Sequence, residues 1–265
     1  MSIEILIPTF NKTKEQIQDL VKFLNIKTNA LFANQNGKTE NYNFEIDDHL
    51  IRVICTNTIG VSKNRNILLD NCCGDICVCI DDDCPLVENY VEIIDNFYRI
   101  NQPDYAVFNG NFAKKSGKLV YSKKTKLISH YSNISSAGGP GFTFCRSKII
   151  PVNLRYDESV GTPNYICAGE DSLFYRDLLK TKLKGYRVFT ILFTISNEET
   201  DSSYFSGINE QYVTTRGYIT YLLHPCLFHL YKVRHIIRFK RMNPKLKLHE
   251  LIKFMNCGRK MTSKK

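Results

Sequence analysis

The chain has 265 residues, enough for one large α/β domain or for one domain with a small appendage. With 43% hydrophobic and 23% charged residues, its composition is ordinary for a soluble globular protein. The net charge of +10 is concentrated at one end: residues 224–265 contain twelve Lys or Arg and one acidic residue, Glu250, whereas the other 223 residues balance at −1. Such an asymmetry points to an anionic partner, either a membrane surface or a nucleic acid.

The first hundred residues alternate between predicted strands and helices. Short apolar runs predict strands at Ile3–Ile7, Asn29–Ala33, Ile51–Cys55 and Ile76–Ile80. Helices are expected at Thr13–Leu24, with Thr13 or Asn11 as its cap, at Val61–Leu69 and at Val87–Tyr98. The polar residues 34–48 predict a loop or an irregular edge. This alternation predicts a Rossmann-like, mainly parallel sheet flanked by helices.

Polar residues follow three of these strands. Pro8-Thr9, Thr56-Asn57 and Asp81–Asp83 each stand at the carboxyl end of a predicted strand. Ligands of such sheets bind beyond the carboxyl ends of the strands. We therefore expect the three segments to converge on one cleft.

The second half of the chain is less regular. Strands are expected at Tyr105–Phe108, Lys118–Tyr121, Phe142–Cys145 and Tyr186–Ile195, with one helix at Leu173–Lys180. A glycine-rich loop, from Ser135 to Gly141, precedes the third of these strands. No internal repeat or linker interrupts the pattern, so we expect one α/β domain over residues 1–216 and a basic helical extension over residues 217–265.

The extension has two parts. Tyr218–Tyr231 is apolar and aromatic, but fourteen residues are too few to cross a bilayer, which needs about twenty. Val233–Met242 mixes Arg and Lys with Ile and Phe, as do amphipathic segments that lie among lipid headgroups. We expect association with an anionic membrane surface; the alternative is a solvated helix packed on the domain.

The ten cysteines are expected to stay reduced. The opening MSIEILIPTF has no basic or apolar leader region and no cleavage site, which argues against export. The cluster Cys72, Cys73, Cys77 and Cys79 also lacks the paired C-x-x-C spacing of a structural zinc site. Packing in the core is therefore the expected role of these side chains.

Asp81, Asp82 and Asp83 form the strongest candidate for chemistry. Three adjacent carboxylates after a buried strand repel one another unless a cation is bound. Mg²⁺ or Mn²⁺ fits, because hard cations take carboxylate oxygens and share their remaining positions with phosphates. The alternative is a solvated acidic turn that caps helix Val87–Tyr98.

An ordered set of motifs runs through about residues 3 to 205, although no single piece is specific. The pieces are Ile7-Pro8-Thr9-Phe10-Asn11, Gly60-Val61-Ser62-Lys63-Asn64-Arg65-Asn66, Gly74-Asp75, Ile80-Asp81-Asp82-Asp83, Gly138-Gly139-Pro140-Gly141 and Gly169-Glu170-Asp171. In this order they resemble the inverting family 2 glycosyltransferases of the GT-A fold. The chain looks most like short bacterial members that build capsular, exopolysaccharide or lipopolysaccharide glycans. A cytoplasmic location, peripheral on the inner face of the plasma membrane, follows as an expectation.

The resemblance implies a donor site for a nucleotide-diphosphate sugar. Pro8, Thr9 and Asn11 match the first-strand loop that holds the base and ribose. Asn57, which also stands at a strand end, is expected to contact the donor as well. Arg65 matches an arginine near the donor phosphates, where bidentate contacts are favourable. Asp81 and Asp83 match the ends of the D-x-D motif, with Asp82 between them: Asp83 would bind Mn²⁺ or Mg²⁺, and Asp81 the ribose or the metal. Gly138 and Gly139 match the donor and acceptor loop.

Asp171 matches the general base of the family. Inverting transfer needs a base opposite the leaving group to accept the proton of the acceptor hydroxyl, and an ordinary carboxylate is ionised at pH 7. Glu170 would orient the acceptor or the base. Both acids also suit the first turn of a helix, and the two roles are compatible.

The sequence departs from the pattern of this family at two places, and three other functions are alternatives. Cys84 stands where many members of the family have a further Asp. No His follows the late strand in residues 196–203, so either a carboxylate takes the place of that metal ligand or the site lacks it. An inactive nucleotide-sugar or glycan binder would not need Asp171. A nucleotidyltransferase would start with a glycine-rich basic loop, unlike Pro8–Lys12. A nucleic-acid binder has only the basic tail in its favour. The donor sugar, acceptor, linkage and oligomeric state are not predicted.

Overall fold

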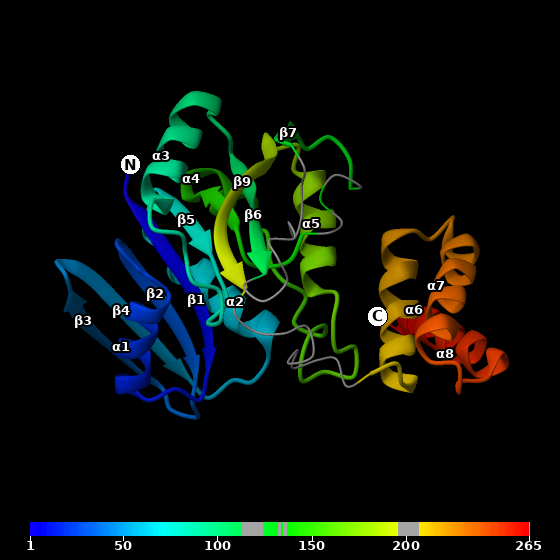
Figure 1. Ribbon diagram of the computed structural model, residues 1–265. Helices are drawn as coiled ribbons and strands as arrows, with labels where there is room; N and C mark the ends of the chain where they lie inside the picture. Colours follow the sequence, from blue (N-terminus) through cyan, green and yellow to red (C-terminus); the bar gives the residue numbers. More distant parts are fainter. Residues whose placement is uncertain (113–123, 132–133, 135–136, 196–206, 265) are drawn as a thin grey trace. The chain divides into compact units, whose positions relative to one another are not determined.

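The computed structural model describes residues 1–112, 124–131, 134, 137–195 and 207–264 (Figure 1). The chain forms two compact units. The sheet unit comprises Met1–Ile59, Lys63–Arg155 and Asp177–Glu198. The helical unit comprises Gly60–Ser62, Tyr156–Arg176 and Glu199–Lys265.

Among the described residues, the sheet unit contains nine hydrogen-bonded strands in the order β3-β4-β2-β1-β5-β8-β6-β9-β7. Their bounds are β1 Ile3–Phe10, β2 Asn29–Gln35, β3 Glu40–Ile46, β4 His49–Thr56, β5 Ile76–Cys79, β6 Tyr105–Phe112, β7 Lys126–Leu127, β8 Phe142–Cys145 and β9 Gly185–Ile195. Strands β4, β2, β1 and β5 run parallel, whereas β8 lies antiparallel to both β5 and β6. The carboxyl ends of β1, β2, β4 and β5 therefore share one edge of the sheet.

The helices lie between and after these strands. Their bounds are α1 Lys14–Phe23, α2 Val61–Asn71, α3 Tyr90–Asn101, α4 Arg146–Ile149, α5 Glu170–Lys180, α6 Glu210–Leu223, α7 Phe228–Met242 and α8 Leu248–Met261, with short 3₁₀ turns at Ile150–Val152 and Thr262–Lys264. Helix α1 starts from a capping box, in which the Thr13 hydroxyl accepts the Gln16 N–H and the Gln16 side chain accepts the Thr13 N–H. Of the two caps that we expected, Thr13 is the one used.

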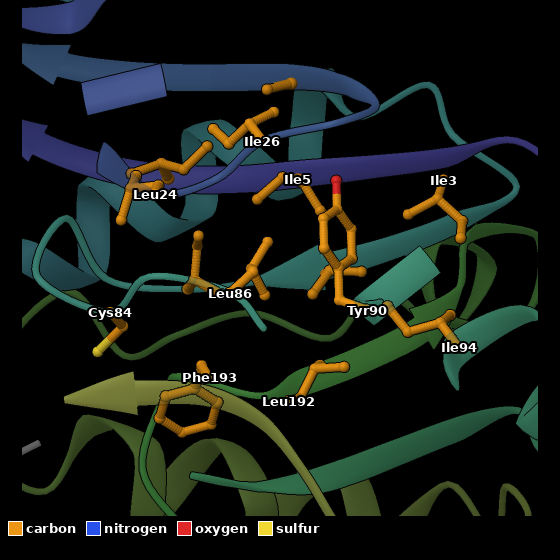
Figure 2. Close-up of a cluster of buried hydrophobic side chains, with 14 of the residues drawn as sticks. Ile3, Ile5, Leu24, Ile26, Cys84, Leu86, Tyr90, Ile94, Leu192 and Phe193 are labelled. Carbon is orange, nitrogen blue, oxygen red and sulfur yellow. The ribbon is translucent and has the colours of Figure 1, made fainter. Parts of the chain in front are cut away.

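The main hydrophobic core lies between one face of the sheet and helices α1 and α3. Alternate residues of β1, such as Ile5, meet Leu24 at the end of α1 and Tyr90 and Ile94 of α3 (Figure 2). The buried Tyr90 hydroxyl remains hydrogen-bonded, because it accepts the Lys27 N–H at 2.8 Å. A buried parallel sheet of this kind explains why the first strands appear in the sequence as continuous apolar runs.

Several predicted elements differ from the observed ones. Residues 40–46 form the edge strand β3, paired antiparallel with β4. Helix α3 begins at Tyr90, three residues later than expected, and α5 begins at Glu170, three residues earlier. The strand expected at Lys118–Tyr121 lies outside the described residues.

The helical unit is organised around α6. Helices α6, α7 and α8 share one apolar cluster that contains Val213, Ile236 and Met255, and α6 also packs on the 156–176 segment through Ile219. The expected start of the extension at residue 217 falls inside α6, so it is not an element boundary. Within the part of the chain that the structure describes, no helix has the length and apolar character needed to cross a bilayer.

Helices α6 and α8 cross at two glycines. A Cβ atom on Gly258 would lie 2.1 Å from the Thr214 carbonyl oxygen, and one on Gly217 would lie 2.2 Å from the Met255 carbonyl oxygen. Both distances are to backbone atoms, which cannot swing aside. The close approach of the two helices therefore requires glycine, which has no side chain, at both positions.

We expect Gly258→Ala to lower the free energy of unfolding by about 2 kcal/mol, because α6 and α8 must separate to admit the methyl group. Intrinsic helix propensity alone predicts the opposite sign, a gain of about 1 kcal/mol. Urea denaturation measures the difference, with the exposed neighbour Cys257→Ala as the control. Unchanged or increased stability in Gly258→Ala would contradict this packing.

Candidate functional site

The loop after β1 is held in shape by Asn34, a fully buried residue at the end of β2. The Asn34 side-chain oxygen accepts the Lys12 N–H at 3.2 Å, and its amide nitrogen donates to the Lys12 carbonyl oxygen at 2.8 Å. Asn11 adopts a left-handed conformation, with φ of 51°, and its N–H donates to the Gln35 carbonyl oxygen at 3.0 Å. The turn from β1 into α1 is thus clamped to the neighbouring strand.

The expected donor residues of this loop differ in exposure. Pro8 is half-buried, whereas Thr9 is buried. The Thr9 hydroxyl lies 3.3 Å from both the Ala33 carbonyl oxygen and the Asn34 side-chain oxygen, and the Asn64 amide donates to the Thr9 carbonyl oxygen at 3.1 Å. The Thr9 side chain is therefore engaged within the loop scaffold. Asn57 is exposed in the turn that follows β4.

The aspartate run begins directly after Ile80, whose N–H donates to the Leu6 carbonyl oxygen of β1. Asp81 and Asp82 each face a cation. The Arg65 guanidinium of α2 lies 3.5 Å from Asp81, and the Lys12 ammonium lies 3.4 Å from Asp82. The tight turn of the run is closed by the Cys84 N–H, which donates to the Asp81 carbonyl oxygen at 3.1 Å. The structure therefore brings the β1 loop, Arg65 and the aspartates together at one edge of the sheet.

Burial is the main influence on these carboxylates. It raises the pKa of Asp81 and of Asp82 above the ordinary value, although Arg65 and Lys12 each oppose the rise, and the neighbouring carboxylates add to it. The two facing cations thus compensate the negative charge only in part. A further cation would favour the ionised forms.

The alternative role as a helix cap is not supported by the structure. The N-cap of α3 is Asn89, six residues beyond Asp83, and no side-chain hydrogen bond closes that cap. The aspartates instead occupy the turn that leaves β5. Their half-buried position beside two cations is not a consequence of capping.

The glycine-rich loop adjoins the same sheet edge. The Gly141 N–H donates to the Cys79 carbonyl oxygen of β5 at 2.9 Å, and Gly141 has φ of 80°. A Cβ atom there would lie 2.6 Å from the Phe193 ring, so glycine is needed for both conformation and space. Gly138 and Gly139 precede this point, and Gly139 is buried. Ser135 and Ser136 lie outside the described residues.

Glu170 and Asp171 belong to the helical unit, where they form the first turn of α5. Both are half-buried, and the preceding Gly169 has φ of 106°. Acidic side chains in this position are stabilised by the helix dipole, which confirms the helix-start role expected for them. The 196–203 stretch, which contains no His, lies outside the described residues.

Three polar residues at this edge were not predicted as site residues from the sequence: Lys12, Asn34 and Asn64. The sequence contained only a weak indication of them, since Asn34 is the last but one residue of the apolar strand β2, at the same edge as the expected loops. Asn64 is buried on α2, one residue before Arg65, and its side-chain oxygen has no hydrogen-bond partner among the described residues. The edge is therefore more polar in its interior than the motifs alone indicate.

The donor set suits a hard divalent cation in part. Among the described residues, no group of three or more His, Cys, Asp or Glu side chains is arranged to hold a metal. Mg²⁺ typically uses one or two protein carboxylates and completes its shell with water and substrate phosphates. Two carboxylates that burial makes harder to ionise, beside Lys12 and Arg65, fit that kind of shared site.

No family profile matches this sequence. No curated protein matches it either. Its structure, however, is similar to crystal structures of TarS from S. aureus. The comparison with TarS 1–349 in complex with UDP-GlcNAc gives a TM-score of 0.67 at 14% identity, over 97% of this chain and 79% of that one. The comparison with TarS 1–349 alone gives a TM-score of 0.63 at 12% identity, over 100% of this chain and 92% of that one. The comparison with TarS 1–349 in complex with UDP gives a TM-score of 0.61 at 13% identity, over 97% of this chain and 79% of that one. At these identities the similarity establishes the fold, and it confirms the expected GT-A-like α/β architecture.

We expect Asn34→Ala to lower the free energy of unfolding by about 2 kcal/mol, because the Lys12 N–H and carbonyl oxygen lose their partners. Urea denaturation tests this. The matched control is Asn43→Ala at an exposed position of β3, for which we expect a change within about 0.5 kcal/mol. Equal effects of the two substitutions would rule out the clamp.

We expect Asp82→Asn to raise the melting temperature at pH 7 in metal-free buffer by about 1 to 2 °C. The pKa of Asp82 is higher in the folded protein than in the unfolded chain. Between the two pKa values the folded protein holds more protons, so the free energy of unfolding falls as the pH rises from the unfolded to the folded pKa. Asp82→Asn removes this loss of stability, so the gain in melting temperature should disappear below about pH 4, where Asp82 is protonated in both states. A benefit that persists at pH 3, or a lower melting temperature at pH 7, would contradict the direction of the shift.

Proposed function

We propose that this protein transfers a sugar from a nucleotide-diphosphate donor, a UDP-sugar, to a hydroxyl of a glycan or lipid-linked acceptor in surface-polysaccharide biosynthesis. The observation that carries the proposal is the polar edge at the ends of β1 and β5, where partly compensated aspartates lie beside Arg65 and Lys12. Support also comes from the fold, which is similar to that of TarS structures in complex with UDP-GlcNAc and UDP.

The donor would bind along this edge. Pro8, Asn11 and Asn57 would hold the base and ribose with backbone and side-chain groups, while Thr9 keeps the loop in shape from within. Arg65 would contact the diphosphate, because its planar guanidinium suits bidentate phosphate contacts. Lys12 would add a second positive charge to the same region.

The aspartates would divide the remaining tasks of donor binding. Asp83 and Asp81 would hold Mn²⁺ or Mg²⁺, Asp81 with the ribose as a second partner, and Asp82 would keep Lys12 in position. When bound, the metal would neutralise the charge that develops on the departing diphosphate. Gly138 and Gly139 leave their loop without side chains that would crowd the sugar.

Asp171 is the proposed general base, with Glu170 as the residue that orients the acceptor or the base. Asp171 would accept the proton of the acceptor hydroxyl while the hydroxyl oxygen attacks the anomeric carbon of the donor sugar and the nucleoside diphosphate departs. The reaction would be one displacement that inverts the anomeric configuration, with no glycosyl-enzyme intermediate. Positioning and charge neutralisation would supply most of the acceleration.

A screen of nucleotide sugars tests the activity directly. The folded protein is incubated with each donor and either Mn²⁺ or Mg²⁺, and release of the free nucleotide is measured. We expect slow, metal-dependent hydrolysis of at least one UDP-sugar. Inactivity towards every donor would count against an enzyme, and tight binding without turnover, with every acceptor tried, would favour the inactive binder.

Two substitutions separate the proposed roles. We expect Asp83→Asn to abolish metal-dependent binding of the donor, since it removes a metal ligand. Asp171→Asn should leave donor binding intact and lower transfer by about 10²- to 10⁴-fold, the usual range for a lost general base. Calorimetry measures binding and nucleotide release measures turnover.

The exposed Glu92→Gln on α3 is the matched control for both carboxylate changes. It should alter neither quantity. Full transfer activity in Asp171→Asn would eliminate this residue as the base, and unchanged donor affinity in Asp83→Asn would eliminate it as a metal ligand.

A further inference from the structure

The outer face of α7 exposes an apolar stripe. Leu230, Val233 and Ile237 follow one another at the i, i+3, i+7 spacing of a helix face, and their exposed fractions are 67%, 54% and 50%. The opposite face is buried in the helical unit through Phe228, Ile236 and Phe239. The helix thus has two apolar faces, and in the part of the chain that the structure describes the face of Leu230, Val233 and Ile237 is the exposed one.

Arginines border this stripe. Arg234, Arg238 and Arg241, again spaced by one helical turn, line the same surface depression as Leu230, Val233 and Ile237. Phe228–Met242 contains five Lys or Arg and neither Asp nor Glu. Across the described residues, no ion pair or hydrogen bond engages the side chains of these three arginines. Their charge is therefore directed towards solvent.

The charges indicate which partner this face fits. A second copy of the chain docked through the same face would bring two sets of arginines together, with no acidic residue of α7 to compensate them. An anionic bilayer offers phosphates to the arginines and an apolar interior to the stripe, at the depth where amphipathic helices lie. Lys and Arg side chains near such a surface contribute attraction that salt weakens.

We propose that the outer face of α7 binds the surface of an anionic lipid bilayer, with Leu230, Val233 and Ile237 inserted at the boundary of the acyl chains and Arg234, Arg238 and Arg241 on the lipid phosphates. The surface that carries the interaction is this one helix face, within a tail that is basic throughout. The proposal goes beyond sugar transfer and does not depend on it.

Vesicle flotation of the full-length protein tests the proposal. We expect binding to vesicles of phosphatidylcholine with 30% phosphatidylglycerol, and little binding to phosphatidylcholine alone. The pair Arg234→Gln and Arg238→Gln should weaken binding roughly 30-fold, and so should the pair Leu230→Ser and Ile237→Ser. The control pair, Lys245→Gln and Lys253→Gln on the exposed surface outside α7, should weaken it much less.

The outcomes are distinguishable. Equal weakening by the control pair would overturn the assignment to α7, as would equal binding to neutral vesicles. If the protein dimerises and the pair Leu230→Ser and Ile237→Ser abolishes the dimer, the partner of this face is a second copy of the chain instead. UDP binding, measured in parallel, should stay unchanged in every variant, so failure of the donor proposal would be visible separately.

A fluorescence reporter gives a second, independent readout. The protein has no Trp, so Ile237→Trp introduces a single emitting residue within the stripe. Its emission should shift to shorter wavelength on anionic vesicles and be quenched by brominated lipids. Ile100→Trp, at an exposed position of α3, should show neither effect. A silent Trp at position 237, or equal responses at both positions, would contradict insertion of this face.

Discussion

Carboxylates that lose water need positive charge, and this constraint governs the sheet edge around Asp81–Asp83. Parallel pairing of β1 with β5 places the run beside the β1 loop, and two cations meet it there, Arg65 from α2 and Lys12 from the β1 loop itself. These cations do not fully offset the burial, because the pKa values of Asp81 and Asp82 remain raised. An edge in this state is suited to a metal ion with an anionic ligand.

Strands β1, β2 and β5 were predictable because they are buried over most of their length and appear as short, mainly apolar runs. Strand β3 was not, since it lies at the edge of the sheet and alternates exposed with half-buried residues. The site divides in the same way. The aspartates and their place after a strand were evident, whereas the role of Asn34 depends on backbone atoms of Lys12, 22 residues away along the chain. Partnerships of that kind leave no periodic signal in a sequence.

The helical unit shows how small residues and charge can serve different ends in one segment. Gly217 and Gly258 let α6 and α8 approach closely, and α7 packs on this pair of helices through Ile236 and Phe239. The other side of α7 exposes Arg234, Arg238 and Arg241 beside the apolar stripe, as the described residues show. A transferase acting on lipid-linked acceptors would benefit from such a surface, because it would confine the enzyme to the place where its acceptor is found.

Paramagnetic broadening by Mn²⁺ tests the proposed metal site directly, because it locates the metal without reference to any acceptor. Amide NMR spectra of the protein are recorded with UDP, before and after Mn²⁺ is added in small amounts. We expect the signals of residues 9–12 and 81–84 to broaden first, and only when UDP is present. Broadening centred on another part of the chain, or none at all with UDP bound, would contradict it.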